Sequence, residues 1–160
     1  MPKITLLLHN IRSTHNVGSI FRTAEGFGVN RIILTGYTPY PIHPEDSRLP
    51  HLAEKLTKQI QKTALGAISS VPFEHHDNLL TWLEGNTLPL VALEQADRST
   101  YLTDFNPPDE FVLVLGEEVN GIPAELLVKC DSVVEIPMRG KKESFNVSVA
   151  TGIALYALSS

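Results

Sequence analysis

The chain has 160 residues, of which 42% are hydrophobic and 19% charged, values that suit one globular domain with its own core. Its apolar runs are too short to span a bilayer, and its N-terminus lacks the cleavage pattern of a signal peptide, so we expect a cytoplasmic protein. The net charge of −5 argues against strong non-specific binding to nucleic acid, and the single cysteine, Cys130, excludes a disulfide framework and a cage of thiolate metal ligands.

Strand-like and helix-like patterns alternate along the chain. In chain order we expect a strand at 4–8, a helix at 16–27, a strand at 31–35, a loop at 36–50, a surface-exposed helix at 52–60, a strand at 71–74, a helix at 79–83, strands at 88–93 and 111–115, a helix at 123–129, a strand at 133–136 and a helix at 147–158. Strands separated by helices predict an α/β fold with a mostly parallel sheet flanked by helices. No repeat or linker divides residues 1–160, which predicts a single domain. In such folds ligands bind beyond the carboxyl ends of the strands.

Basic side chains gather in the first part of the chain. Residues 1–62 contain eight lysines and arginines and four acidic residues, whereas residues 63–160 contain five and fourteen. A basic half could bind phosphates while the acidic half faces elsewhere, but an uneven solvated surface gives the same distribution.

The first polar segment that stands out is Asn10–Ala24, where the helix at 16–27 begins. Asn16 is placed as an N-cap, and Gly18 would let another backbone come close. Arg22 follows Asn16 by six residues inside a largely apolar helix, so it needs a carboxylate, a carbonyl or a phosphate. An N-cap with an intramolecular salt bridge explains the same residues without a function.

The second segment, Leu113–Pro123, takes a buried strand into a Gly-x-Glu-x-x-Gly loop built on Gly116, Glu118 and Gly121. It matches neither the dinucleotide fingerprint nor a phosphate-binding loop. Its adjacent carboxylates would repel a phosphate but would tolerate a cation or ribose hydroxyls. A plain strand-to-helix turn with solvated acids is the alternative.

The third segment, Val134–Ser148, runs from a strand through a basic glycine loop to a helix. Arg139, Lys141 and Lys142 suit RNA phosphates. Ser144 and Asn146 precede the helix and are both plausible caps, which is the alternative to a functional role.

Together, in this order, the three segments resemble the signature motifs of TrmH-type (SpoU) methyltransferases of the SPOUT superfamily. The resemblance covers almost the whole chain. It implies an α/β fold whose C-terminal part forms a trefoil knot, and a homodimer with its active site near the subunit interface. It also implies transfer of a methyl group from S-adenosylmethionine to a ribose 2′-hydroxyl of RNA, with no metal and no membrane.

The resemblance also assigns residues. Catalytic positions would be Asn16, Arg22, Glu118, Ser144 and Asn146. The cofactor would be bound by Leu93, Glu94, Gly116, Ile136, Met138 and Phe145. RNA would be bound by Arg12, Arg139, Lys141 and Lys142. We expect a single methyltransferase domain without the accessory RNA-binding domain that fuller members of the family carry.

Methyl transfer to the 2′-hydroxyl needs a base or a strong electrostatic partner, because the hydroxyl is a weak acid. Arginine is effectively always protonated, so we expect Arg22 to hold the phosphate beside the target and to stabilise oxyanion character, with transient proton acceptance left open and His15 as the next candidate.

The expected substrate is a folded tRNA, with rRNA as the alternative.

Other functions fit the sequence less well. A non-catalytic RNA-binding module and an enzyme that methylates a base nitrogen are two alternatives to a ribose methyltransferase. A metallo-hydrolase built on His75 and His76 is disfavoured, because adjacent residues of a strand point to opposite faces.

Overall fold

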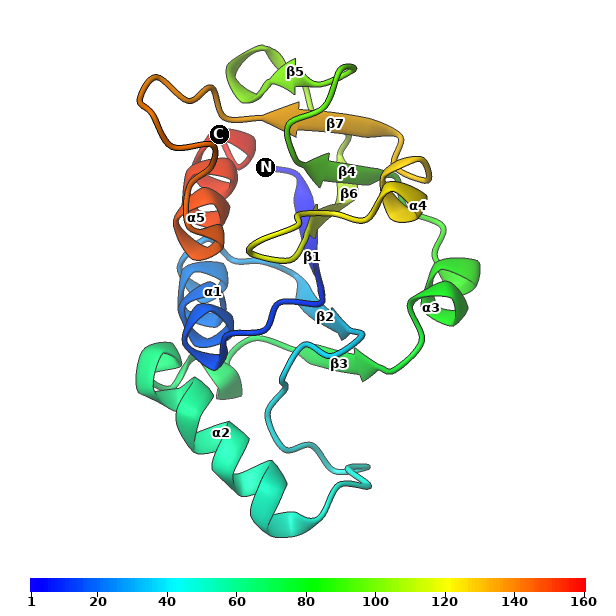
Figure 1. The fold of residues 1–160 in the computed structure, drawn as a ribbon. Coiled ribbons are helices and arrows are strands. Elements are labelled where there is room, and N and C mark those ends of the chain that lie inside the picture. Colours follow the sequence, from blue (N-terminus) through cyan, green and yellow to red (C-terminus); the bar gives the residue numbers. More distant parts are fainter.

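The computed structural model describes residues 1–160 and contains one seven-stranded sheet in which every pairing is parallel (Figure 1). The strand order is β3-β2-β1-β6-β4-β7-β5. The strands are β1 (Lys3–His9), β2 (Arg31–Thr35), β3 (Phe73–His76), β4 (Leu90–Leu93), β5 (Thr100–Tyr101), β6 (Glu110–Leu115) and β7 (Ser132–Glu135). The predicted α/β class with a parallel sheet is confirmed.

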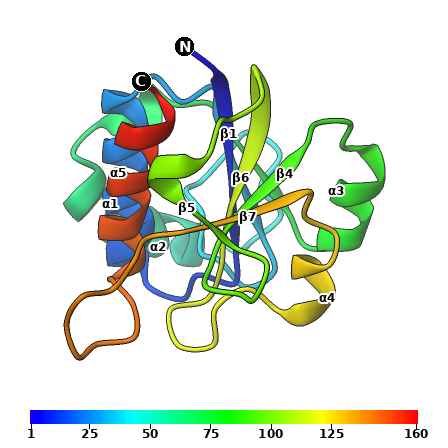
Figure 2. The same ribbon diagram turned by 90° about the horizontal axis from the view of Figure 1, so that it is seen from above.

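Helices cover both faces of this sheet. They are α1 (Thr14–Gly26), α2 (Pro50–Ala64), α3 (Leu79–Gly85), α4 (Ala124–Leu127) and α5 (Val147–Leu158), with short 3-10 turns at Ala67–Ser69 and Leu102–Asp104. Figure 2 shows α1, α2 and α5 on one face and α3 and α4 on the other. The side chains of β1 alternate accordingly: Leu6 and Leu8 join the larger core cluster, and Leu7 joins the smaller one. Burial on both faces explains why the central strands are almost wholly apolar.

Helix α1 begins earlier than the sequence pattern indicates. Its N-cap is Ser13, whose hydroxyl accepts a hydrogen bond from the backbone N–H of Asn16 at 3.1 Å. The prediction of Asn16 as the N-cap is therefore wrong. Asn16 lies within the first turn and is buried, which frees its amide for contacts with distant parts of the chain.

Helix α2 is longer than predicted and is not simply a surface helix. Ala53, Ile60 and Ala64 are buried, and Ile60 and Ala64 belong to the same core cluster as the apolar residues of α1. The two helices approach closely at Gly18, where a Cβ would collide with the carbonyl oxygen of Ile60 and the hydroxyl of Thr63. The close approach expected of Gly18 is confirmed, and small residues on both helices explain it.

Smaller differences concern short elements. Strand β3 lies two residues later than predicted, β4 starts at Leu90, and α4 is shorter at both ends. The two-residue strand β5 was not predicted, because a segment of that length has no periodicity to detect. Helix α5 and strand β2 match their predicted bounds.

The C-terminal segment passes close to the segment that follows β6. Figure 2 shows the loop between β7 and α5 and the loop between β6 and α4 at the same end of the sheet. Helix α5 then packs beside α1. The trefoil knot expected for this segment stays a prediction. No helix of the chain is long and apolar enough to cross a membrane.

Candidate active site

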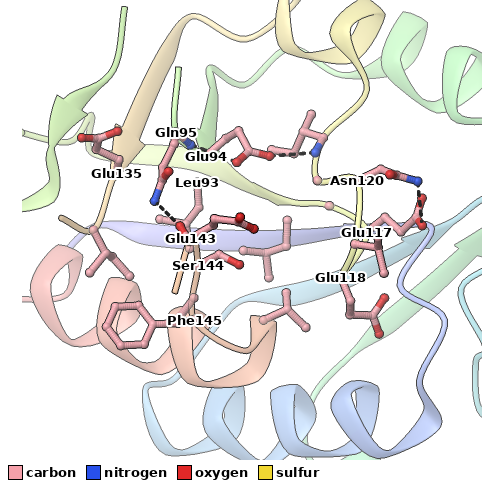
Figure 3. Close-up of a pocket in the computed structure, with 18 of the residues that line it drawn as sticks. Leu93, Glu94, Gln95, Glu117, Glu118, Asn120, Glu135, Glu143, Ser144 and Phe145 are labelled. Carbon is pink, nitrogen blue, oxygen red and sulfur yellow. Dashed lines mark hydrogen bonds between the residues drawn. The ribbon is translucent and has the colours of Figure 1, made fainter. Parts of the chain in front are cut away.

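A cavity of about 700 Å³ opens beyond the carboxyl ends of β4, β6 and β7 (Figure 3). Its walls are the loops that follow these three strands, closed on one side by the segment that enters α5. Half of the 22 lining residues are hydrophobic. The cavity therefore lies where parallel sheets place their ligands.

The cavity is acidic. Five glutamates line it and no lysine, arginine or histidine does: Glu94, Glu117, Glu118, Glu135 and Glu143. Such a lining favours a ligand that is cationic or uncharged where it meets the wall, and disfavours a phosphate.

Glu118 is fixed by the segment that precedes α1. Its Oε1 accepts a hydrogen bond from the backbone N–H of Arg12 at 3.0 Å, and its Oε2 accepts from the backbone N–H of Ser13 and from Nδ2 of Asn16, both at 3.1 Å. Burial raises the pKa of Glu118, but these hydrogen bonds outweigh burial and hold the pKa below its ordinary value. Glu118 is therefore ionised at neutral pH and joins the second motif to the first.

Asn16 extends this connection to the third motif. Its Oδ1 accepts a hydrogen bond from Nδ2 of Asn146 at 3.2 Å, and Oδ1 of Asn146 caps α5 by accepting from the backbone N–H groups of Ser148 and Val149. Asn146, not Ser144, is the N-cap of α5. One line of side-chain hydrogen bonds, Glu118–Asn16–Asn146, thus connects the three sequence motifs.

Glu94 ties the β4 loop to the β6 loop. One carboxylate oxygen accepts from the backbone N–H of Ile122 at 2.9 Å, and the other accepts from the backbone N–H of Gln95 (Figure 3). Gly121 has φ +70° and lies against this carboxylate, so a side chain there would be strained and would collide with Glu94. The glycines of the second motif are required by this packing. Gly116 is another case, since a Cβ there would lie 2.6 Å from the backbone nitrogen of Ile122.

The structure brings together most residues assigned from the sequence. All six expected cofactor-binding residues line the cavity, as do Glu118, Ser144 and Asn146. Phe145 is 40% exposed and lies over α5, at the end of the cavity opposite Glu118 (Figure 3). Asn16 lies directly behind the wall, bonded to Glu118 and Asn146.

The basic residues lie elsewhere. Arg22 is exposed on α1, does not line the cavity, and makes no hydrogen bond or ion pair; neither the expected carboxylate nor an intramolecular salt bridge is present. Arg139, Lys141 and Lys142 lie on the exposed loop before α5, and Arg12 lies outside the cavity.

Several lining residues were not predicted. Gln95 donates a hydrogen bond through its amide to the backbone carbonyl of Glu143 at 2.8 Å, closing the cavity on one side. Glu117, Asn120 and Glu135 also line it. Their positions directly after β6 and at the end of β7 were the available signal, because residues that end parallel strands share one edge of the sheet. No group of three or more histidine, cysteine or acidic side chains that could hold a metal ion is present.

Comparison with known proteins identifies the family. The model of the SpoU rRNA Methylase family matches residues 3–156. The chain belongs to this family. A curated relative in it, the 23S rRNA (guanosine-2′-O-)-methyltransferase of Coxiella burnetii, is 32% identical over 158 residues, which are 97% of this chain and 57% of the relative.

Solved structures share the fold. The AdoMet-bound rRNA methyltransferase from Sinorhizobium meliloti matches with a TM-score of 0.79 at 25% identity, over 97% of this chain and 55% of that one. A structure described as giving insights into the 2-OH methylation of C/U34 on tRNA matches with a TM-score of 0.74 at 25% identity, over 97% of this chain and 93% of that one. This chain thus spans little more than half of the curated relatives but nearly the whole of the last structure.

Proposed function

We propose that this SpoU-family chain transfers a methyl group from S-adenosylmethionine to a ribose 2′-hydroxyl of RNA. The observation that carries the proposal is the acidic, half-apolar cavity at the ends of β4, β6 and β7, joined to the three motifs by Glu118, Asn16 and Asn146. The family membership and the names of the relatives support the same reaction.

The cavity fits S-adenosylmethionine. Its volume of about 700 Å³ lies within the range of small-molecule sites, and its glutamates suit a cation but not a phosphate. Leu93, Ile136 and Met138 offer apolar contact for a nucleoside, and Glu94 and Gly116 shape the adjoining turns. When bound, the cofactor would supply an electrophilic methyl group on a sulfonium.

The chain's own residues would orient the hydroxyl and exclude water. The Ser144 hydroxyl has no hydrogen-bond partner within the chain and lines the cavity, so it is free to position the incoming ribose. Glu118 would act as a positioning residue, because all its hydrogen bonds hold the start of α1 against the β6 loop. The 2′-hydroxyl would give up its proton to solvent as its oxygen takes the methyl group and the sulfonium becomes a neutral thioether, and a site of low polarity favours this loss of charge.

Arg22 must act from another subunit if it acts on the hydroxyl. It lies about 9 Å along α1 from Asn16, outside its own cavity, and that cavity contains no basic residue. We therefore propose a homodimer in which Arg22 of one subunit approaches the cavity of the other. Val149 and Tyr156, which are 51% and 71% exposed, would lie in the interface on α5. Leu155 and Leu158, on the same helix, are buried within the chain itself.

The substrate we propose first is a tRNA. The likeness to the structure connected with the 2-OH methylation of C/U34 on tRNA, at a TM-score of 0.74, supports this choice. An rRNA substrate is the second candidate, favoured by the names of the curated relatives. A cytoplasmic location, a single domain and a reaction without metal stay predictions.

Calorimetry and methylation mapping test the proposal. S-adenosylmethionine and its demethylated product should both bind, and a chelator should leave both affinities unchanged. Loss of one ribose methylation in tRNA from a deletion strain would identify the substrate, and loss in rRNA instead would establish the second candidate. Absence of cofactor binding would contradict the proposed reaction.

A further inference from the structure

A second cavity, of about 560 Å³, adjoins the candidate active site. It lies between the segment before α1, the loop after β2, helix α2 and the end of β3. Arg12 and Ser13 line it, and the backbone N–H groups of these two residues are the ones that bind Glu118 in the first cavity. The two cavities therefore share one wall.

Hydrogen bonds join two of the segments that line this cavity. Asn10 has φ +58°, unusual for a residue with a side chain, and its Oδ1 accepts a hydrogen bond from the backbone N–H of Tyr37 at 3.0 Å. The buried hydroxyl of Thr38 accepts from the backbone N–H of Ile11 at 3.1 Å. These bonds hold the segment that carries Arg12 against the segment that carries Tyr37.

A stack of side chains supports the loop from behind. The ring of Tyr40 lies 3.5 Å from the ring of His75, with centroids stacked, and the Arg48 guanidinium lies 3.5 Å from the centroid of Tyr40. The Arg48 guanidinium donates hydrogen bonds to the carboxylate of Asp46 and to the backbone carbonyls of Tyr40 and Pro41. These side chains contact one another and hold the loop after β2 in place.

Arg12 and Tyr37, in contrast, have free functional groups. The Tyr37 side chain is 51% exposed, and the Arg12 guanidinium lies 5.9 Å from its ring centroid. Neither the guanidinium nor the phenolic hydroxyl makes a hydrogen bond or an ion pair within the chain. The one carboxylate that lines this cavity, Asp77, lies 3.5 Å from His75.

We propose that Arg12 and Tyr37 form a subsite for an unpaired nucleotide of the substrate RNA, next to the nucleotide whose ribose is methylated. Tyr37 stacks on the base, and Arg12 binds the phosphate. Aromatic rings bind single-stranded bases by stacking, and guanidinium forks bind phosphates. The acidic first cavity repels a phosphate, so the backbone of the RNA passes over Arg12 instead. This inference rests on the proposed function for its choice of ligand.

Fluorescence titration of the full chain tests the subsite. The probe is a short single-stranded RNA oligonucleotide with one 2-aminopurine, whose emission is quenched on stacking. Tyr37→Ala should weaken binding about 5- to 100-fold and abolish the quenching, whereas Tyr37→Phe should retain both. Arg12→Ala should reduce the magnitude of the salt slope by about 0.7, the value for one single-strand phosphate contact.

A matched control shows whether the effect is specific to Tyr37 or follows the loss of any exposed tyrosine. Tyr101 is 50% exposed on β5 and lines neither cavity, so Tyr101→Ala should bind the oligonucleotide as the unaltered chain does. Failure of the unaltered chain to bind the oligonucleotide, or equal affinity of Tyr37→Ala, would overturn the subsite. Calorimetry of S-adenosylmethionine binding reports separately on the proposed function, because the Tyr37 variants leave the cofactor cavity intact.

Discussion

At the scale of single residues, Glu118 shows how a carboxylate in an acidic cavity can stabilise the fold. Its four neighbouring glutamates in the cavity would disfavour another negative charge, but its oxygens meet two backbone N–H groups and the amide of Asn16. Both oxygens accept, so an amide in place of the carboxylate would turn a donor toward a donor whichever way it is rotated.

Glu118→Gln should therefore lower stability and remove a pH dependence. The folded-state pKa of Glu118 is lowered, so its stabilising effect is fully present above the unfolded pKa of about 4.3 and is lost as pH falls through the folded value. Thermal melts between neutral and acid pH should show a gap between the unaltered chain and Glu118→Gln that narrows on acidification. The control is Glu117→Gln, whose amide oxygen can still accept the exposed hydrogen bond from Asn120, so this variant should follow the unaltered chain. A gap that is constant with pH would contradict the role given to Glu118.

Substitution of Arg22 tests its proposed function most directly. Because its guanidinium has no partner within the chain, Arg22→Ala should leave the melting temperature nearly unchanged. Turnover should fall roughly 100- to 1000-fold, as expected when one preorganised electrostatic contact is lost, while cofactor affinity stays nearly intact. Arg22→Lys should rescue poorly, because a point charge does not reproduce a planar fork. Near-normal single-turnover rates in folded Arg22→Ala would remove this residue from the mechanism.

At the scale of elements, the packing of α1 on α2 determines where the first motif lies. Gly18→Ala would place a methyl group against the Ile60 carbonyl and the Thr63 hydroxyl, so we expect a loss of about 1–3 kcal/mol in the free energy of unfolding. Gly26→Ala in the same helix is the matched control, because nothing lies within 4 Å of a Cβ there. That substitution should be neutral or stabilise by up to about 1 kcal/mol. Denaturant unfolding measures both, and equal effects would show that α1 and α2 are not in close contact.

The loop between β7 and α5 is a second element with a testable property. Lys141 and Lys142 are exposed at its tip, away from the acidic cavity. If they bind RNA phosphates, replacing both by alanine should weaken RNA binding and reduce the salt slope by up to about two phosphate contacts. Unchanged affinity in a folded double variant would exclude this loop from the RNA interface.

At the scale of the whole molecule, the separation of Arg22 from its own cavity predicts complementation between subunits. Arg22→Ala and Ser144→Ala chains should each be inactive, but mixed dimers contain one site with both residues intact. Equal mixing after subunit exchange should restore about a quarter of the unaltered activity if each site is shared between two subunits. Light scattering should show a dimer, and Val149→Glu should shift it toward monomer by placing a charge in the interface. No recovery in confirmed mixed dimers would show that Arg22 and Ser144 act from the same subunit and would contradict the shared site.

The sequence by itself determined the central strands, helix α5 and part of the lining of the candidate site. Apolar runs such as those of β2 and β6 predict strands from neighbouring residues alone, and the three motifs contain residues that line the cavity. The tertiary structure decided the rest. Asn16 bonds to residues 102 and 130 positions away, so its place behind the cavity wall depends on how the chain returns to α1 and not on the helix pattern around it. The same holds for Tyr37 and Arg12, which meet only because β1 and β2 are neighbours in the sheet and end at the same edge. Periodicity reports which face of an element is buried, but strand order and long-range hydrogen bonds decide which functional groups share a cavity.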